Sequence, residues 1–267
     1  DDMLSGAEQP RQVAEEESLF YKINFRLGRL YEVMQENKNS ITKEQSDLQE
    51  LISDISHQVK TPIANLKIIN STLMEQDVPA QKQKEFLAAQ AGQLDKLDFL
   101  MQAMIKTSRL EAGVISLEKK EQPIYYTLAA ALGGILLGAE KKQIDVQVDC
   151  PEHLEACHDR KWTGEALFNI LDNAVKYTPT GGQIHVQVEA WEMYLKIDIA
   201  DTGIGIPEQH QGTIFKRFYR EDAVHDVEGI GIGLYLAREI ISLQGGYIRV
   251  ASEVGKGSVF SVFLLRK

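Results

Sequence analysis

Apolar side chains recur every three or four residues through the first part of the chain, between about residues 15 and 76. A stripe this narrow, sustained over so many turns, is typical of a coiled coil rather than of a helix on a globular surface. The polar stretch 35–46 interrupts it, which predicts either a stutter or a junction between two helical segments. The stripe consists of Leu19, Ile23, Leu27, Leu30, Met34, Leu48, Leu51, Ile55 and Val59.

A second amphipathic helix is predicted over about 80–111, after a turn at 77–79. Two long helices joined by a short turn form an antiparallel hairpin. A single hairpin leaves its apolar stripe half covered, whereas two hairpins bury it in a four-helix bundle, so we predict a homodimer. The apolar positions of the second helix are Phe86, Leu87, Leu94, Leu97, Leu100, Met101, Met104, Ile105 and Leu110.

The pattern changes after Gly113, where residues 113–123 are expected to form a linker. Beyond Pro123, helices and largely antiparallel strands alternate, which favours a two-layer α/β sandwich. The predicted class is therefore α+β, with a long helical hairpin followed by this sandwich. We expect helices at 124–140, 160–176 and 232–244, and strands near 143–149, 155–158, 183–190, 193–200, 246–252 and 257–265.

Composition narrows the classes of function. The formal net charge of −10 argues against a nucleic-acid-binding surface. Two cysteines do not make a disulfide framework and suit a reducing cytosol. The longest uncharged apolar run, 128–139, has 12 residues and is too short to span a bilayer, and no signal peptide is recognisable at the start. Any membrane attachment is expected through segments absent from this chain.

One histidine stands out in the first long helix. His57 and Thr61 lie four residues apart and therefore share a helix face. Pro62 lacks a backbone N–H, and its ring clashes with the carbonyl of Gln58. We expect the helix to bend or loosen just after His57, where a large ligand could approach a nucleophilic imidazole.

A segment of the predicted helix 160–176 has the chemistry of a phosphate and metal site. Asn169, Asn173 and the pair Lys176/Tyr177 fall on one helix face. An asparagine oxygen is a hard, neutral ligand of the kind that Mg²⁺ takes beside phosphate oxygens and waters. The ammonium group of Lys176 can add positive charge at the phosphates.

Three further segments point to a nucleotide. Asp201 follows a strand and can accept a hydrogen bond from an exocyclic amine such as that of adenine, while the glycines of 203–205 allow close approach to the base. The arginines of 215–220 can reach a γ-phosphate. The glycines of 229–234 stand at the mouth of a helix, where anions are favoured, and 208–228 is expected to be a mobile lid.

Each segment is a weak signal alone, and the second glycine run lacks the spacing of a Rossmann fingerprint. Together and in this order they closely resemble the sensor histidine kinases of two-component systems, from about residue 45 to the C-terminus. Residues 1–40 show no comparable match. The matched boxes are the H-box SHQVKTP, the N-box NILDNAVKY, the glycine box DTGIGIP, the F-box IFKRFYR, the glycine box GIGIGL and the GxGS element at 255–258.

The resemblance implies an ATP-binding sandwich of the gyrase/Hsp90/histidine kinase/MutL type and a hairpin that dimerises into a four-helix bundle. It divides the chain into an N-terminal tail and signalling coiled-coil helix (1–44), a dimerisation and histidine phosphotransfer domain (45–112), a linker (113–123) and a catalytic ATP-binding domain (124–267). It also implies the cytoplasmic portion of a bacterial inner- or plasma-membrane sensor protein.

By the same resemblance, His57 attacks the γ-phosphate of ATP and passes the phosphoryl group to an aspartate in the receiver domain of a response regulator. Asn173 would hold Mg²⁺ and Asp201 would read adenine, while Thr61 would place a water for dephosphorylating the regulator. The implied nucleotide-binding residues are Asn169, Asn173, Lys176, Tyr177, Asp201, Gly203, Gly205, Ile206, Arg217, Arg220, Gly229, Gly231, Ile232, Gly233 and Leu234.

One departure from the family pattern concerns the catalytic base. The family usually has an acidic residue directly after the histidine, and here that position is Gln58. An amide oxygen can accept the Nδ1–H and set the tautomer, but it has no charge to stabilise a forming imidazolium. We therefore expect Gln58 to slow autophosphorylation.

Two other functions compete with the kinase. An ATP hydrolase of the gyrase/Hsp90/MutL type needs a glutamate four residues before Asn173, and that position is Asn169, which cannot act as a base. A non-catalytic dimeric scaffold is the other alternative, since Gln58 departs from the family. The cluster Cys150, His153, Cys157 and His158 lacks a standard metal-binding spacing, so we interpret it as strand and turn residues.

Overall fold

The computed structural model describes residues 10–75, 78–111, 113, 115–221 and 229–266. The chain divides into two compact units, residues 1–57 and 58–267. Part of the predicted turn at 77–79 and part of the predicted lid at 208–228 lie outside the described residues. Within the described part, no helix is both long and apolar enough to cross a membrane.

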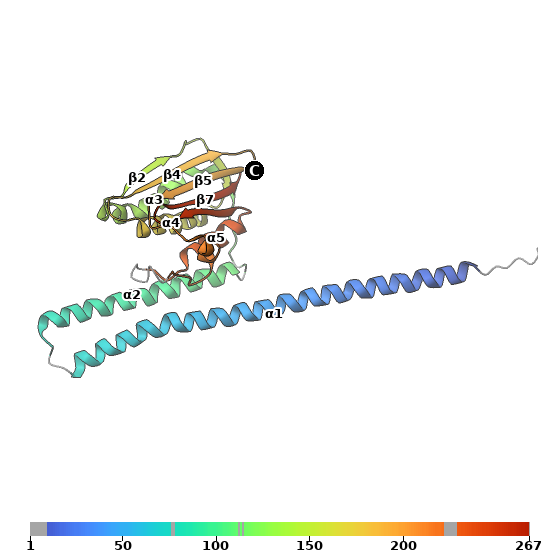
Figure 1. Ribbon diagram of the computed structural model, residues 1–267, viewed down its shortest axis with the longest axis horizontal. Helices are drawn as coiled ribbons and strands as arrows, with labels where there is room; N and C mark the ends of the chain where they lie inside the picture. The colour runs from blue at the N-terminus through green and yellow to red at the C-terminus, as the bar shows by residue number, and fades with distance from the viewer. Residues whose placement is uncertain (1–9, 76–77, 112, 114, 222–228, 267) are drawn as a thin grey trace, which may run out of the picture. The chain divides into compact units, whose positions relative to one another are not determined.

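Two long helices come first. Helix α1 runs over Pro10–Glu75 and α2 over Ala80–Glu111 (Figure 1). Helix α1 continues through the polar stretch 35–46, so that stretch is not a junction between separate helices. It also continues past Pro62 to its end, because a proline removes only one backbone hydrogen bond of a long helix.

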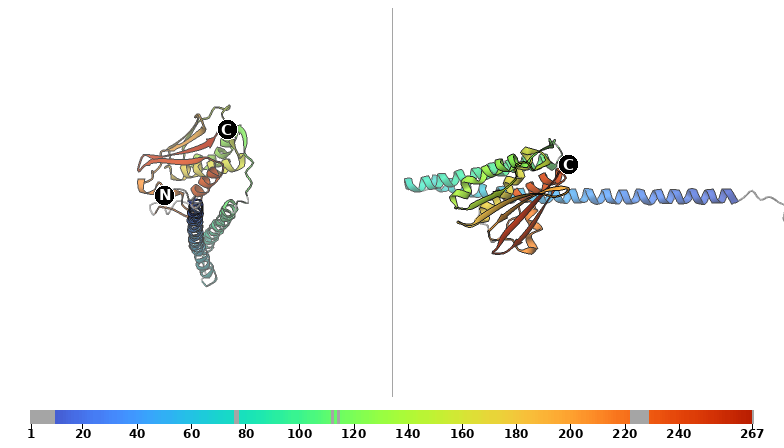
Figure 2. Two further views of the ribbon diagram at one scale, coloured as in Figure 1. Left: turned by 90° about the vertical axis from the view of Figure 1, so that its right-hand side faces the viewer. Right: turned by 90° about the horizontal axis from the view of Figure 1, so that it is seen from above.

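The C-terminal part is a two-layer sandwich, as predicted. A five-stranded sheet has the order β2-β4-β5-β7-β6, with β2 parallel to β4 and the other pairs antiparallel. Three helices cover one face of this sheet (Figures 1 and 2). The strands are β2 Asp145–Asp149, β4 Gln183–Ala190, β5 Tyr194–Asp201, β6 Tyr247–Glu253 and β7 Gly257–Leu265, and the helices are α3 Ile124–Lys141, α4 Arg160–Tyr177 and α5 Gly233–Leu243.

The end of the predicted linker is a strand. β1 (Lys120–Pro123) pairs antiparallel with β3 (Glu155–His158) and forms a separate two-stranded sheet. Four residues are too few to show a period, and the pairing depends on a strand more than 30 residues away in the sequence. The prediction of a linker over 113–123 is therefore wrong for residues 120–123.

The core lies between the sheet and the helices. Alternate residues of β5, namely Leu195, Ile197 and Ile199, are fully buried, as the period-two pattern requires. Helix α4 contributes Leu167, Ile170 and Leu171 to the same apolar layer. This packing fixes α4 and the end of β5, and both carry residues of the predicted nucleotide site.

A polar network fixes the first turn of α4. Asp159 caps the helix, because its Oδ1 accepts hydrogen bonds from the backbone N–H groups of Lys161 and Trp162. Its Oδ2 accepts the N–H of Glu118 at 2.9 Å. The Asp159 N–H donates to Oε1 of Gln244, beside the end of α5. The segment before β1, the start of α4 and the end of α5 are thereby joined.

A buried neutral histidine lies next to this network. His158 has no exposed surface, its Nδ1 donates to the carbonyl of Ala156 at 3.0 Å, and Nε2 lies 2.8 Å from Oγ1 of Thr127. Because a carbonyl can only accept, Nδ1 carries the proton and Nε2 accepts from the threonine. Burial lowers the pKa of His158 below its ordinary value. Both ring nitrogens are thus engaged within the fold rather than in a metal site.

His158 makes stability depend on pH. Because its folded pKa is lowered, the unfolded chain binds the proton first as pH falls below about 6.5, and stability declines from there down to the folded pKa. We expect a loss of about 1 kcal/mol from this group per unit of pH below that value. Denaturant unfolding of the full chain, followed through the tryptophan fluorescence of the sandwich, measures it.

The His158→Gln variant should show a shallower decline, because its side chain does not titrate. His185→Gln, which removes an exposed histidine of β4, is the matched control and should keep the original slope. Equal slopes in the original chain and in His158→Gln would contradict this account.

Candidate nucleotide site and phosphoacceptor histidine

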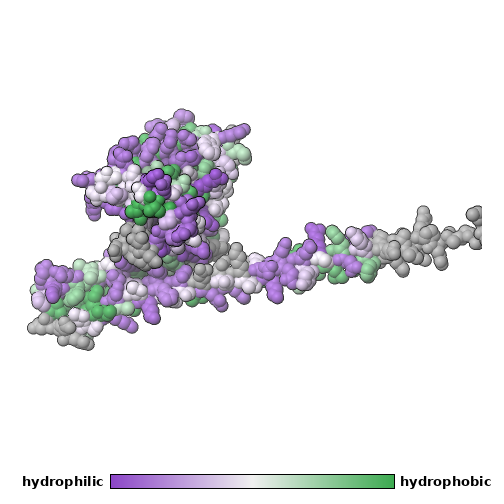
Figure 3. Space-filling view, in the orientation of Figure 1, coloured by the Kyte–Doolittle hydropathy of each residue, from purple (hydrophilic) through white to green (hydrophobic). Residues whose placement is uncertain are grey.

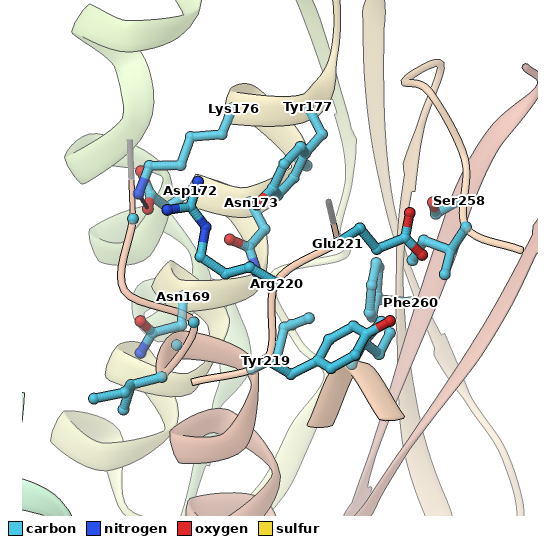
Figure 4. Close-up of a pocket in the computed structure, with 18 of the residues that line it drawn as sticks. Asn169, Asp172, Asn173, Lys176, Tyr177, Tyr219, Arg220, Glu221, Ser258 and Phe260 are labelled. Carbon is cyan, nitrogen blue, oxygen red and sulfur yellow. Dashed lines mark ion pairs between the residues drawn. The ribbon is translucent and has the colours of Figure 1, made fainter. Parts of the chain in front are cut away.

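A pocket opens beside α4 and the end of β5 (Figure 4). Segments from six parts of the sequence line it: Phe99 of α2, helix α4, the end of β5 with the loop after it, residues 214–221, the glycine run before α5, and β7. Most of the residues predicted to bind the nucleotide line it, namely Asn169, Asn173, Lys176, Tyr177, Asp201, Gly205, Ile206, Arg220, Gly229, Gly231, Ile232, Gly233 and Leu234.

Asp201 is the buried acid of this pocket. It is the last residue of β5 and is 9% exposed. Burial raises the pKa of its carboxyl group, and hydrogen bonds from the backbone N–H groups of Gly203 and Ser258 oppose that rise. The Gly203 N–H lies 2.8 Å from Oδ1. A carboxyl held this firmly in an apolar wall is suited to recognise a specific donor such as the exocyclic amine of a purine.

Close packing of the backbone explains the glycines of the first glycine box. Gly205 has φ of 73°, and a Cβ there would overlap the carbonyl of Glu253 in β6. The next residue, Ile206, donates its N–H to Oγ of Ser252 at 2.8 Å. Gly203 does not line the pocket, and its part is to hold the Asp201 carboxylate. The loop is thereby pinned to the sheet with Gly205 and Ile206 in the pocket wall.

Helix α4 presents the amides and the cation as its periodicity predicts (Figure 4). The Nδ2 of Asn169 donates to the carbonyl of Glu165 at 2.8 Å, so the amide is oriented by the helix itself. Its Oδ1 faces Gly233, where an added Cβ would lie 2.9 Å from that oxygen. Lys176 forms an ion pair with Asp172 one turn earlier, at 2.6 Å.

The two arginines of the F-box differ in their positions. Arg220 lines the pocket, as predicted for a residue that meets phosphates. Arg217 does not line it: its guanidinium donates to the hydroxyl of Tyr235 at 2.9 Å and lies 4.8 Å from the centre of that ring. Arg217 therefore packs on the first turns of α5, and spacing alone could not separate it from Arg220.

The second glycine box leads directly into α5. This helix begins at Gly233, and its N-cap Ile232 makes no side-chain capping bond. The first-turn N–H groups of a helix favour an anion. Gly231 has φ of 78°, and a Cβ there would lie 2.6 Å from the carbonyl oxygen of Tyr219. Glycine is thus required where the box meets the F-box segment.

Several lining residues were missed at the level of sequence. Ser258 belongs to the GxGS element, which was noticed without a role, and Phe260 follows from the alternation of β7. Six others lie within the matched boxes without an assigned role: Asp172, Ala174, Ile204, Ile214, Tyr219 and Ile230. Phe99 of α2 and Glu221 lie outside the boxes, and nothing in the sequence singled them out.

His57 lies on α1 with an exposed side chain. Thr61, one turn later, is also exposed, and Gln58 is half-buried. Because residues four apart on a helix point the same way, the two exposed side chains share a face that is open to solvent. The pairing of His57 with Thr61 on that face agrees with the prediction from their spacing.

Comparison with known families supports this assignment of parts. Residues 47–113 match the His Kinase A (phospho-acceptor) domain. Residues 158–267 match the histidine kinase-, DNA gyrase B- and HSP90-like ATPase family. The first match contains His57, and the second contains the described pocket from α4 to β7.

Relatives of known name match both regions together. Drug sensory protein A of Synechocystis sp. is 31% identical over 225 residues, which are 79% of this chain and 34% of that protein. Sensor protein SrrB of Staphylococcus aureus is 31% identical over 224 residues, with 80% of this chain and 37% of the relative covered. The chain therefore spans about a third of the length of these relatives.

Solved structures show the same fold. Histidine kinase ThkA, crystallised with the response regulator protein TrrA, superposes with a TM-score of 0.67 at 22% identity, covering 84% of this chain and 64% of that one. Histidine kinase AdeS of Acinetobacter baumannii gives 0.64 at 19% identity, covering 79% and 98%. The chain belongs to the sensor histidine kinases and contains their phosphoacceptor and ATP-binding domains in that order.

Proposed function

We propose that this chain is an ATP-dependent protein-histidine kinase that phosphorylates itself on His57 and passes the phosphoryl group to an aspartate of a response regulator. The observation that carries the proposal is the convergence on one pocket of the buried Asp201, the α4 amides and the glycine box before α5. The exposed His57 on the preceding helical part supplies the acceptor.

In the proposed reaction, a ring nitrogen of His57 attacks the γ-phosphorus of ATP. A nitrogen–phosphorus bond forms, the bond from that phosphorus to the β,γ-bridging oxygen breaks, and ADP leaves with the electron pair. Such transfer depends on positioning and electrostatics more than on covalent chemistry by the protein. Asp201 would orient the base, and Arg220 and Lys176 would stabilise charge on the phosphates.

The α4 amides fit a magnesium ion shared with the nucleotide. The amide of Asn169 is held by the Glu165 carbonyl and that of Asn173 lines the same wall, so both offer neutral oxygen-bearing groups beside the phosphate site. Mg²⁺ typically keeps several waters and takes few protein ligands beside phosphate oxygens. Bound there by Asn173, it would neutralise phosphate charge.

The apolar surface of the helices supports a homodimer. In the second unit, Ile68 is 64% exposed, Leu87 56% and Leu94 57%, and Figure 3 shows apolar side chains on the surface of the hairpin. In the first unit, Phe20 is 68% exposed and Leu27 56%. A stripe this exposed along long helices is expected to be covered by the same stripe of a second copy.

The proposal includes the partner and the setting. The response regulator would bring its receiver domain to the exposed face of α1, where Thr61 would place a water for the reverse, phosphatase reaction. The relatives, about three times as long, are named as sensory or sensor proteins. We place the chain as the cytoplasmic portion of a bacterial membrane sensor on that basis.

His57→Gln should separate binding from chemistry. This variant is expected to bind ATP normally and to form no phosphohistidine, whereas Asp201→Asn should lose roughly tenfold or more in ATP affinity because an amide nitrogen replaces an acceptor oxygen. Calorimetry of ATP binding and mass-spectrometric mapping of the labelled residue measure the two effects. Phosphorylation of the His57→Gln chain at another residue would overturn the assignment.

Gln58→Glu should accelerate autophosphorylation. A carboxylate at this position would stabilise the imidazolium that forms as the bond is made, and we expect a gain of roughly fivefold or more in the initial rate. Gln45→Glu, which adds the same charge at an exposed position of α1, is the matched control and should leave the rate unchanged. A phosphohistidine time course without any gain for Gln58→Glu would refute the role of this position.

Leu94→Glu should weaken self-association. A charge buried in the core of a bundle is strongly disfavoured. At micromolar concentration, sedimentation velocity should therefore show a mixture of monomer and dimer, or monomer alone. The exposed polar position Gln81 of the same helix provides the control Gln81→Glu. An original chain that sediments as a monomer at all concentrations would contradict the homodimer.

A further inference from the structure

A hydrogen bond outside the motifs joins a histidine to one wall of the nucleotide pocket. Nδ1 of His210 lies 2.6 Å from Oε1 of Glu221. His210 ends the short 3-10 helix η1, Glu208–His210, which directly follows the first glycine box. Glu221 lies at the end of the wall segment 219–221, whose three residues all line the pocket (Figure 4).

Hydrogen bonds hold the backbone of His210 in place. Its backbone N–H donates to the carbonyl of Pro207 at 2.8 Å, and its backbone carbonyl accepts from Oγ1 of Thr213 at 2.9 Å. The neighbouring Gln211 donates through Nε2 to the carbonyl of Ser252 in β6 at 2.8 Å. The backbone of His210 is therefore fixed close to the sheet, and its imidazole hydrogen-bonds from there to Glu221.

The wall segment needs such a restraint because it begins with a strained turn. Phe218 has φ of 58°, a conformation that a bulky residue keeps only when its surroundings enforce it. The next carbonyl, that of Tyr219, packs against Gly231. The segment is thus held by packing at one end and by the His210–Glu221 pair at the other, with Arg220 between the two.

We propose that His210 and Glu221 are positioning residues that hold Arg220 at the phosphate side of the pocket, and that protonation of His210 tightens this hold. The inference rests on the proposed function, since it takes Arg220 to meet the phosphates of ATP. Neither residue of the pair acts on the substrate in this proposal. Both act through Arg220, which lies between Glu221 and the turn at Phe218.

The pH dependence follows from the chemistry of the pair. A carboxylate only accepts, so Nδ1 of His210 donates to Glu221 in either protonation state, and Nε2 of the neutral ring can accept from the Gln209 amide at 3.3 Å. The acceptor is already ionised, so protonation of the ring adds the attraction between opposite charges to an existing charge-assisted hydrogen bond. Histidine side chains change charge between about pH 5 and 8.

Among the described residues, the charged groups near the pair are of both signs. Glu208 lies on the same short helix, and the ring of Tyr219 has its centre 6.1 Å from that of His210. Arg220 adjoins Glu221 in the sequence. Across the pocket, burial raises the pKa of the Tyr177 phenol; the positive charge of Arg220 opposes this rise, and the carboxylates of Asp172 and Glu221 add to it.

The test compares ATP affinity at about pH 6 and about pH 8 in the full chain with Mg²⁺, by calorimetry, together with KM and kcat for autophosphorylation. His210→Gln should bind ATP roughly two- to fivefold more weakly at the lower pH, a range that suits a half-exposed pair, with kcat little changed. His210→Lys should keep tight binding at both values, because its charge does not titrate there. Since the terminal phosphate of ATP also titrates, the difference between variants is what counts.

Two further variants show whether the pair acts through Arg220. In an Arg220→Gln background, His210→Gln should have no additional effect, and Glu221→Gln should reproduce His210→Gln without adding to it. His185→Gln, on the exposed face of β4, is the matched control and should retain the pH response of the original chain.

Three results would overturn the inference: an unchanged pH response in His210→Gln, equal affinities for His210→Lys and His210→Gln, or a full effect of His210→Gln without Arg220. In each of these the original chain still binds ATP and becomes phosphorylated. Failure of the original chain to do either would instead refute the proposed function, so the two outcomes are distinguishable.

Discussion

The burial of one carboxyl group at the end of β5 constrains the whole nucleotide site. Asp201 can stay in an apolar wall only because backbone N–H groups of Gly203 and Ser258 hydrogen-bond to it, and those groups are in place only when the loop after β5 turns back on itself and β7 pairs with β5. That loop also requires glycine at position 205, because a Cβ there would overlap the carbonyl of Glu253. The chemistry of the pocket and the topology of the sheet therefore depend on one another.

Two walls of the pocket, α4 and the segment 219–221, are held in place by different kinds of contact. Helix α4 is held by a packed apolar layer and by the capping network of Asp159, so its amides are presented by a rigid element. The wall formed by 219–221 is irregular backbone, restrained by a strained turn at Phe218 and by the His210–Glu221 pair. In a site built this way, the wall held by polar contacts can change its conformation, for example with pH, while the packed wall and the fold stay intact.

The phosphoacceptor follows a different principle. In the proposed function, His57 and Thr61 need no pocket of their own, because their reaction partners would be protein domains that approach a solvent-exposed helix face. The apolar residues elsewhere on α1 and α2 are exposed for another reason, since a single pair of helices cannot enclose its own stripe. The exposure of a histidine and of a leucine on the same helices thus has opposite functional meanings.

The motifs and their periodicity determined a large part of this picture. The two-layer sandwich, the face of α4 that carries Asn169 and Asn173, and the sharing of one helix face by His57 and Thr61 all follow from local rules of spacing and alternation. These rules succeed because residues on one face of a regular element stay neighbours whatever the rest of the chain does. The homodimer and the effect of Gln58 remain predictions of the same kind.

Tertiary structure decided what those rules could not reach. The pairing of β1 with β3, the turning of Arg217 toward Tyr235 while Arg220 lines the pocket, and the contact of His210 with Glu221 each join residues whose separation in the sequence has no period. Two arginines three positions apart carry the same local signal, yet they reach different places, on either side of the left-handed backbone at Phe218. Local sequence fixes what a segment offers, whereas the packing of distant segments fixes which of those groups meet.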